Sequence, residues 1–128
     1  MSALRAVTDD QVVHTLRDVV NERPDHVYVS PAGEYGGCLY VDPSDGCPSC
    51  LVGHVLYRLG ADMTGVARAE NAGPDDASER GGLRLSIRAE QLLATAQAQQ
   101  DCGETWGTAL QVAEDEDERR QVACAQRT

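Results

Sequence analysis

Apolar residues recur with helical spacing along the first part of the chain, between Thr8 and Pro24. They occupy positions i, i+1, i+4, i+7 and i+8 and so share one face of a helix: Val12, Val13, Leu16, Val19 and Val20. Thr8 and Gln11 have the spacing of a capping box, in which each side chain bonds the backbone N–H of the other residue. We therefore predict a helix that begins after Thr8 and ends before Pro24.

A second apolar face follows a turn at residues 42–46, where the sequence is Asp-Pro-Ser-Asp-Gly. Pro48 is tolerated in the first turn of a helix, and Gly60 can cap its end in the left-handed conformation. The apolar face between them consists of Leu51, Val52, Val55, Leu56 and Leu59. We predict a second helix over residues 48–59.

Two short segments between these helices favour strands. Residues 27–29 read Val-Tyr-Val and residues 39–41 read Leu-Tyr-Val, with a connection that contains glycine at residues 31–37. We predict a short β-hairpin between the first and second helices. It must pack on the helices, because an isolated two-stranded hairpin is only marginally stable in water.

The second half of the chain alternates between breaks and helical spacing. A short helix is expected over residues 64–70, and Gly-Pro and Gly-Gly pairs in residues 71–82 predict an exposed loop. A longer helix is expected over residues 86–101. A last helix begins at Thr105 and carries Trp106 toward the core.

The last helix leads into an acidic segment, residues 114–128, which we expect to be helical or frayed. It opens with Glu114, Asp115, Glu116, Asp117 and Glu118. The fold class expected for the chain is α+β and mainly α-helical, with four to five helices and the hairpin, in a single domain over residues 1–128.

The charge of the chain narrows the class of partner. Its formal net charge is −10, which repels nucleic-acid phosphates and anionic lipids. The first twenty residues lack the apolar region of a signal peptide, and no run of eighteen apolar residues occurs. We expect no direct nucleic-acid binding, no membrane association and a cytoplasmic location. The sequence predicts no particular oligomeric state.

Cysteine and histidine supply the most specific chemical pattern. The chain has five cysteines, an odd number, which favours free thiols or metal ligands over a disulfide framework. Cys38, Cys47, Cys50 and His54 have the spacing C-x8-C-x2-C-x3-H and could bind one zinc ion between the hairpin and the second helix. The cofactor expectation is therefore either none or one zinc ion.

Two other interpretations of the same residues stay open. Cys47 and Cys50 could be a redox pair at a helix start, since the surrounding segment resembles the active-site segment of glutaredoxins. Residues 61–128 lack the further strands of that fold. Alternatively, Cys38 and Cys50 are small buried apolar residues, and His54 is an amphipathic side chain at the core margin. Cys102 and Cys124 have no partner at metal-ligand spacing.

Three segments together resemble a group of small uncharacterised proteins of actinobacteria and their phages. They are Cys38-Leu39-Tyr40, the run Pro48-Ser49-Cys50-Leu51-Val52-Gly53-His54-Val55-Leu56-Tyr57-Arg58-Leu59-Gly60, and Gln100-Asp101-Cys102-Gly103-Glu104-Thr105-Trp106-Gly107-Thr108-Ala109-Leu110. The resemblance covers Cys38, Cys50 and His54 but not clearly Cys47. It implies an origin in phage or actinobacteria, with the cytoplasm of the host cell as the location of a phage-encoded protein, and it implies no reaction.

The leading hypothesis is a non-enzymatic phage-type accessory protein that binds a host or phage protein, because an acidic surface complements a basic partner. Residues 114–118 are the candidate partner-binding segment. Three alternatives remain: a small zinc-binding interaction module, an acidic DNA mimic that inhibits a DNA-binding protein, and a thiol-disulfide oxidoreductase that uses Cys47 and Cys50.

Overall fold

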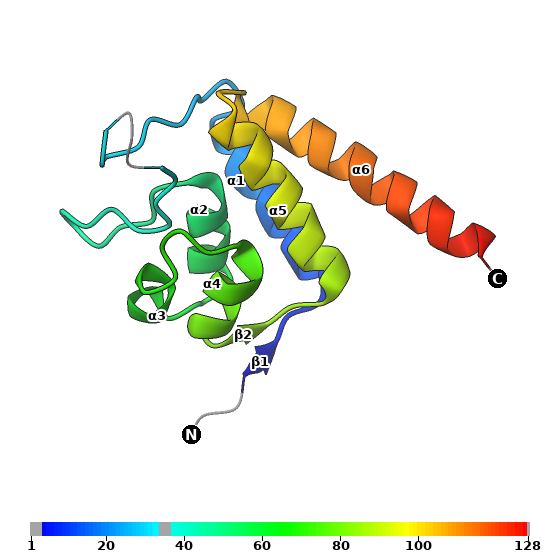
Figure 1. Ribbon diagram of the computed structural model, residues 1–128, viewed down its shortest axis with the longest axis horizontal. Helices are drawn as coiled ribbons and strands as arrows, with labels where there is room; N and C mark the ends of the chain where they lie inside the picture. Colours follow the sequence, from blue (N-terminus) through cyan, green and yellow to red (C-terminus); the bar gives the residue numbers. More distant parts are fainter. Residues whose placement is uncertain (1–3, 34–36, 128) are drawn as a thin grey trace.

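The computed structural model describes residues 4–33 and 37–127, and over these residues the chain is mainly helical (Figure 1). Six helices and one two-stranded sheet lie in the described part of the chain. Their order is β1 (Arg5–Ala6), α1 (Asp9–Glu22), α2 (Leu51–Arg58), α3 (Met63–Ala67), α4 (Pro74–Arg80), β2 (Leu83–Arg84), α5 (Ile87–Asp101) and α6 (Trp106–Gln126). The predicted fold class is confirmed, with slightly more helices than expected.

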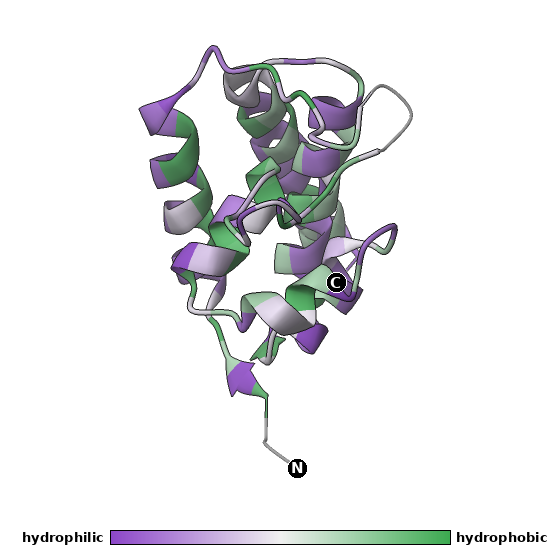
Figure 2. Ribbon diagram, turned by 90° about the vertical axis from the view of Figure 1, so that its left-hand side faces the viewer, coloured by the Kyte–Doolittle hydropathy of each residue, from purple (hydrophilic) through white to green (hydrophobic). Residues whose placement is uncertain are grey.

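The helices enclose one hydrophobic core. Helix α5 lies along α6, and α1 packs against α2, α5 and α6. Hydrophobic and hydrophilic residues alternate along the helices, as the colours of Figure 2 show, and the buried residues are mainly the apolar ones. Trp106, at the start of α6, is fully buried together with Leu16 and Leu56. The core is built largely from valine, leucine and alanine around this one indole ring.

Polar caps begin the long helices where the sequence predicted them. The amide of Gln11 donates to Thr8 Oγ1 at 3.1 Å, and the amide of Thr8 donates to Gln11 Oε1 at 2.9 Å, so the capping box is confirmed. Ser86 and Thr105 cap α5 and α6 with a single side-chain oxygen each, which accepts from the amides of Ala89 and Thr108. Gly60 follows α2 with a φ of 87°, the left-handed conformation that glycine adopts without strain.

The predicted β-hairpin is wrong. Among the described residues, the strands are β1 and β2, which pair in parallel, Arg5 opposite Leu83. Val27 instead forms an isolated antiparallel bridge with Thr105, which ties the segment after α1 to the start of α6. The valine and tyrosine residues correctly indicated extended segments. Each segment, however, pairs with another part of the chain and not with the other segment.

The turn at residues 42–46 explains where the second predicted strand goes. Asp42 Oδ1 accepts from the amide of Ser44 at 2.9 Å, and the turn folds the chain back on itself. The amide of Ser49 then donates to the carbonyl of Tyr40 at 2.9 Å, and the amide of Cys50 donates to the carbonyl of Leu39 at 3.0 Å. Residues 47–50 therefore pair with residues 39–42, and the predicted start of the second helix at Pro48 is replaced by this pairing.

The exposed loop predicted over residues 71–82 is also wrong, because it contains helix α4. Pro74 occupies the first turn of that helix, where its missing N–H costs nothing, and acidic residues follow it in the same turn. Ala77 and Ser78 are buried. A Cβ at Gly65 would overlap the carbonyl oxygen of Arg80, so α3 and α4 approach at a glycine. Gly73-Pro74 marks a helix start here.

The acidic end of the chain is helical. Helix α6 continues through residues 114–118 to Gln126 and extends away from the rest of the molecule in Figure 1. In the described part of the chain, no helix is long and apolar enough to span a lipid bilayer.

Candidate functional site

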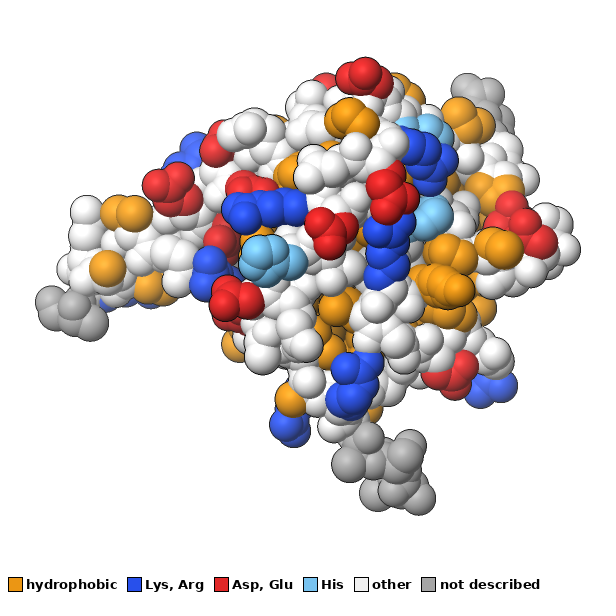
Figure 3. Space-filling model, turned by 180° about the vertical axis from the view of Figure 1, so that it is seen from behind, with side chains coloured by type: hydrophobic (Ala, Val, Ile, Leu, Met, Phe, Trp, Pro, Cys, Tyr) orange, Lys and Arg blue, Asp and Glu red, His pale blue; other side chains and the backbone are white. Residues whose placement is uncertain are grey.

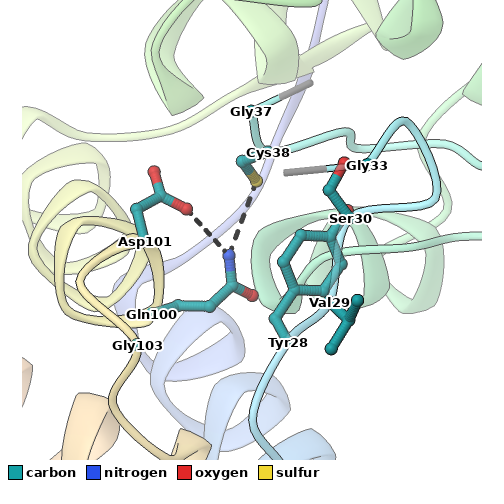
Figure 4. A pocket seen from close by; sticks show the side chains of 9 residues that line it. All are labelled: Tyr28, Val29, Ser30, Gly33, Gly37, Cys38, Gln100, Asp101 and Gly103. Carbon is teal, nitrogen blue, oxygen red and sulfur yellow. Dashed lines mark hydrogen bonds between the residues drawn. The ribbon is translucent and has the colours of Figure 1, made fainter. Parts of the chain in front are cut away.

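A pocket of about 530 Å³ opens between the segment after α1 and the C-terminal end of α5 (Figure 4). The sulfur of Cys38 points toward the amide of Gln100, with Asp101 on the same side and Tyr28 and Ser30 on the opposite side (Figure 4). The complete set of lining residues is Tyr28, Val29, Ser30, Gly33, Gly37, Cys38, Gln100, Asp101 and Gly103. Its volume is within the range of small-ligand sites.

Tyr28 holds the wall of the pocket opposite α5. Its hydroxyl lies 2.9 Å from Ser49 Oγ, and it accepts from the amide of Leu39 at 3.2 Å. The ring thus joins the segment after α1 to the residue that follows Cys38 and to the chain before α2. Burial raises the pKa of this phenol, so it stays protonated at neutral pH.

Cys38 is surrounded by hydrogen-bond donors. The Nε2 atoms of Gln97 and Gln100 lie 3.3 Å and 3.5 Å from its sulfur, and the thiol of Cys50 also bonds it. The bond from Cys50 and those from the two glutamines lower the pKa of Cys38, against the opposing effects of burial and of the Asp101 charge. These hydrogen bonds make the thiolate of Cys38 more accessible than that of an ordinary cysteine.

Cys50 interacts with Cys38 and is completely buried. It is the N-cap residue of α2, where its sulfur accepts from the amide of Gly53 at 3.4 Å. Burial raises the pKa of Cys50 well above that of an ordinary thiol, and the hydrogen bond to Cys38 acts in the same direction. The pKa values of the two neighbouring thiols therefore shift in opposite directions.

Gln100 fixes the polar side of the pocket. Its Oε1 accepts from the backbone N–H of Leu51 at 2.8 Å and from Trp106 Nε1 at 3.2 Å. Both partners are pure donors, so this oxygen is assigned by the contacts themselves and the amide nitrogen must face Cys38. The orientation of the donor toward the sulfur thus follows from the packing of α2 and α6 on α5.

Asp101 places a carboxylate at the same pocket. Gln100 Nε2 donates to Asp101 Oδ1 at 3.1 Å, and burial raises the pKa of this carboxyl. Within residues 4–33 and 37–127, no arginine forms an ion pair with it. This exposed carboxylate therefore has no ion-pair partner within the described residues.

The structure brings together two of the four predicted zinc ligands. Cys38 and Cys50 meet, whereas His54 contacts Trp106 with ring centroids 5.6 Å apart and lies 3.5 Å from an Arg23 nitrogen. Cys47 is exposed beside Asp45. Across the described segments, no three or more histidine, cysteine or acidic side chains cluster closely enough to hold a metal ion. The four-ligand zinc site stays a prediction without a cluster to support it.

The predicted redox pair of Cys47 and Cys50 has its two thiols in different environments. Cys47 is exposed and its pKa is raised by the nearby charge of Asp45, while Cys50 is buried and interacts with Cys38. A raised pKa lowers the thiolate population of Cys47, which opposes its expected role as the attacking thiol. The partner that Cys50 meets in the fold is Cys38.

The predicted partner-binding segment, residues 114–118, is largely engaged within the chain. Glu114 binds Arg17 of α1 at 2.8 Å, and Asp117 binds Arg88 of α5 through two hydrogen bonds of 3.0 Å. Glu116 pairs with Arg119. Acidic and basic side chains are interspersed on the face seen in Figure 3. The acidic tract thus attaches α6 to its neighbours as well as facing solvent.

Comparison of this chain with protein families, with curated proteins and with solved structures finds no match. The resemblance to small actinobacterial and phage proteins therefore stays a prediction. It did include Gln100 and Asp101 in one of its segments, although neither residue was expected at the site. Tyr28 and Gln97 carried no signal in the sequence, since their roles depend on tertiary contacts alone.

Proposed function

We propose that this protein is a binding module that recognises a basic segment of a partner protein, with one arginine or lysine side chain of the partner in the Cys38 pocket. The observation that carries the proposal is the Asp101 carboxylate, which is exposed at the pocket and forms no ion pair with an arginine among the described residues. A cation from a partner would supply the charge that this carboxylate lacks.

Desolvation gives the preference for a cation its physical basis. Removing a carboxylate from water is unfavourable unless an opposite charge or several hydrogen bonds compensate it. Asp101 receives one hydrogen bond from Gln100 and another from the Cys38 side chain, and both lower its pKa against the effect of burial. The negative charge of Asp101 attracts a positive side chain to this pocket.

The remaining surface of the pocket suits the long stem of such a side chain. Tyr28 presents an aromatic ring, and Val29 and the glycines of the rim add apolar or open surface. Lysine and arginine bury their methylene groups against apolar surface while their charged ends reach a polar partner, and aromatic rings attract cations. The pocket thus combines the two features that recognition of a basic residue requires.

The charge of the whole molecule favours a protein partner over a nucleic acid. A net charge of −10 attracts basic peptide segments at long range and repels phosphate backbones. The acidic tract of α6 contributes to this field, although Glu114 and Asp117 are neutralised by Arg17 and Arg88. Long-range attraction by the surface charge and specific contact at Asp101 therefore contribute separately to the affinity for a basic peptide.

Fluorescence anisotropy with a labelled peptide tests the proposal. The probe is a short glycine-serine peptide with one central arginine and a second basic residue, compared with the same peptide carrying citrulline in place of arginine. The variant Asp101→Asn should weaken binding of the arginine peptide about tenfold, since a charge-assisted hydrogen bond contributes about 1.5 kcal/mol. The control Glu118→Gln removes one charge at an exposed position of α6 and should leave the affinity nearly unchanged.

Equal losses in Asp101→Asn and Glu118→Gln would show attraction by net charge alone and would overturn the pocket assignment. A covalent readout complements the affinity. The chain contains no lysine. Carbodiimide coupling of a lysine peptide should therefore join the peptide amine to the carboxyl of Asp101 without competition from side-chain amines of the protein. Coupling spread evenly over the acidic residues of α6 would contradict the proposal.

A further inference from the structure

Two thiols that are twelve positions apart in the sequence meet at the pocket. The amide of Cys50 donates to the carbonyl of Leu39 at 3.0 Å, which places the chain just before α2 beside the chain that carries Cys38. The thiol of Cys50 then bonds the sulfur of Cys38. The backbone pairing of residues 39–42 with 47–50 thus brings the two cysteines to neighbouring positions, where their side chains interact.

The two sulfurs differ in their access to solvent. Cys38 lines the pocket of about 530 Å³ and is only partly buried, so a small solute can reach it (Figure 4). Cys50 has no exposed surface. A reagent therefore meets Cys38 first, and Cys50 can react only with a group that is already attached to Cys38.

The surroundings of Cys38 also prepare it to attack. Gln97 and Gln100 direct amide N–H groups at its sulfur, and the Gln100 amide is held in that orientation by Leu51 and Trp106. Donors of this kind stabilise a thiolate, which is the nucleophilic form of cysteine. Exposed Cys47 has the opposite environment, because the carboxylates of Asp45 and Asp42 disfavour its thiolate.

We propose that Cys38 and Cys50 form a reversible intrachain disulfide when a hydroperoxide enters the pocket, with Cys38 as the attacking thiol and Cys50 as the resolving thiol. The pair differs from the Cys47–Cys50 motif that the sequence indicates. The proposal concerns covalent modification of the protein and does not depend on the binding of a basic segment.

The chemistry balances in two steps. The Cys38 thiolate attacks one oxygen of the hydroperoxide, the O–O bond breaks, and the leaving oxygen takes up the proton that the thiol gave to solvent, which yields a sulfenic acid and water or an alcohol. The sulfur of Cys50 then attacks the sulfenic sulfur. The S–O bond breaks, the S–S bond forms, and the hydroxide leaves as water with the Cys50 proton. A dithiol reductant reverses the change by disulfide exchange.

Mass spectrometry of the full chain tests the proposal. The test protein carries Cys47→Ser, Cys102→Ser and Cys124→Ser, three substitutions at exposed positions, so that Cys38 and Cys50 are the only thiols. Hydrogen peroxide should remove both free thiols and lower the mass by two hydrogen atoms. Cleavage before Asp45 separates the two cysteines, and the resulting peptides should stay joined until a dithiol is added.

The unsubstituted protein supplies a second measurement that no folding defect can confuse. Alkylation in denaturant after brief treatment with peroxide should find Cys38 and Cys50 protected and Cys47, Cys102 and Cys124 still reactive. In Cys50→Ser, where serine can still cap α2, a dimedone probe should trap a sulfenic acid at Cys38. Oxidation of Cys47 before Cys38, or a Cys47–Cys50 disulfide in the unsubstituted protein, would overturn the proposal.

Discussion

The side-chain oxygen of Gln100 accepts a hydrogen bond from the indole nitrogen of Trp106 at 3.2 Å, inside the core and six residues away along the chain. The same oxygen accepts from the amide of Leu51 at the start of α2. One buried glutamine therefore joins the end of α5 to the starts of α2 and α6. Its amide nitrogen faces Cys38, so this core contact also shapes the candidate site.

Gln100→Leu should lower the free energy of unfolding by about 2 kcal/mol, because it leaves the Trp106 and Leu51 donors buried without an acceptor. Urea unfolding measures the change through the transition midpoint and slope. The matched control is Gln91→Leu, the same substitution at an exposed position of α5, which should change stability by less than about 0.5 kcal/mol. Equal effects of the two substitutions would contradict the role of Gln100.

Gly53→Ala should destabilise the protein by about 3 kcal/mol, although alanine ordinarily favours a helix over glycine by about 1 kcal/mol. A Cβ at this position would overlap the carbonyl oxygen of Tyr40, a backbone atom that cannot rotate away. Thermal unfolding should show the lowered midpoint. Tyr57→Ala on the exposed side of α2 serves as the control and should have a small effect. A neutral or stabilising Gly53→Ala would show that the two segments separate easily.

Asp117→Asn should lower the free energy of unfolding by about 1 to 2 kcal/mol, since Asp117 is buried and accepts two hydrogen bonds from Arg88. Glu118→Gln, one position further along α6, removes the same charge from an exposed site and should cost little. Chemical denaturation of both variants compares them directly. If both lose the same stability, the acidic tract acts only through its total charge.

Stability should fall with pH in the range where histidine titrates. Burial, followed by the positive charge of Arg23, lowers the pKa of His54 below its ordinary value of 6.5. The unfolded chain then binds a proton before the folded one does. The histidine contribution is therefore fully present above about pH 6.5 and is lost as the pH falls toward the folded pKa. His26 has a lowered pKa for the same reasons and adds to the loss.

The free energy of unfolding, measured between about pH 7.5 and about pH 5.5, tests this pH dependence. His54→Gln should make the profile flatter than that of the unsubstituted protein. His14→Gln replaces an exposed histidine of α1 and should leave the slope as it was. An unchanged slope in His54→Gln would remove His54 as a source of the effect.

Local signals predicted the helices well, because caps and apolar spacing act over a few residues. Thr8, Ser86 and Thr105 each start a helix at the expected place, and Gly60 ends one. The pairing of extended segments could not be predicted in the same way. Nothing near Val27 in the sequence indicates Thr105 as its partner, since the choice depends on how α1, α5 and α6 pack together.

For a similar reason, only part of the candidate site could be predicted from the sequence. Spacing identified Cys50 and drew attention to Cys38, but it assigned them to a set with Cys47 and His54. The aromatic ring of Trp106 occupies the space beside His54, and the pairing of residues 39–42 with 47–50 turns Cys38 toward Cys50. The roles of Gln97 and Gln100 depend on the sulfur and the donors that surround them in the fold, so the sequence alone does not predict them.

The sulfur of Cys50 caps α2, so a chemical change at this sulfur affects a backbone amide of the helix. The amide N–H of Gly53 donates a hydrogen bond to the sulfur of Cys50. A covalent bond to the sulfur would alter the electron density that this proton senses. The nitrogen and proton resonances of a single glycine, followed in an isotope-labelled sample, should therefore reveal the chemical state of a thiol that no solvent molecule touches.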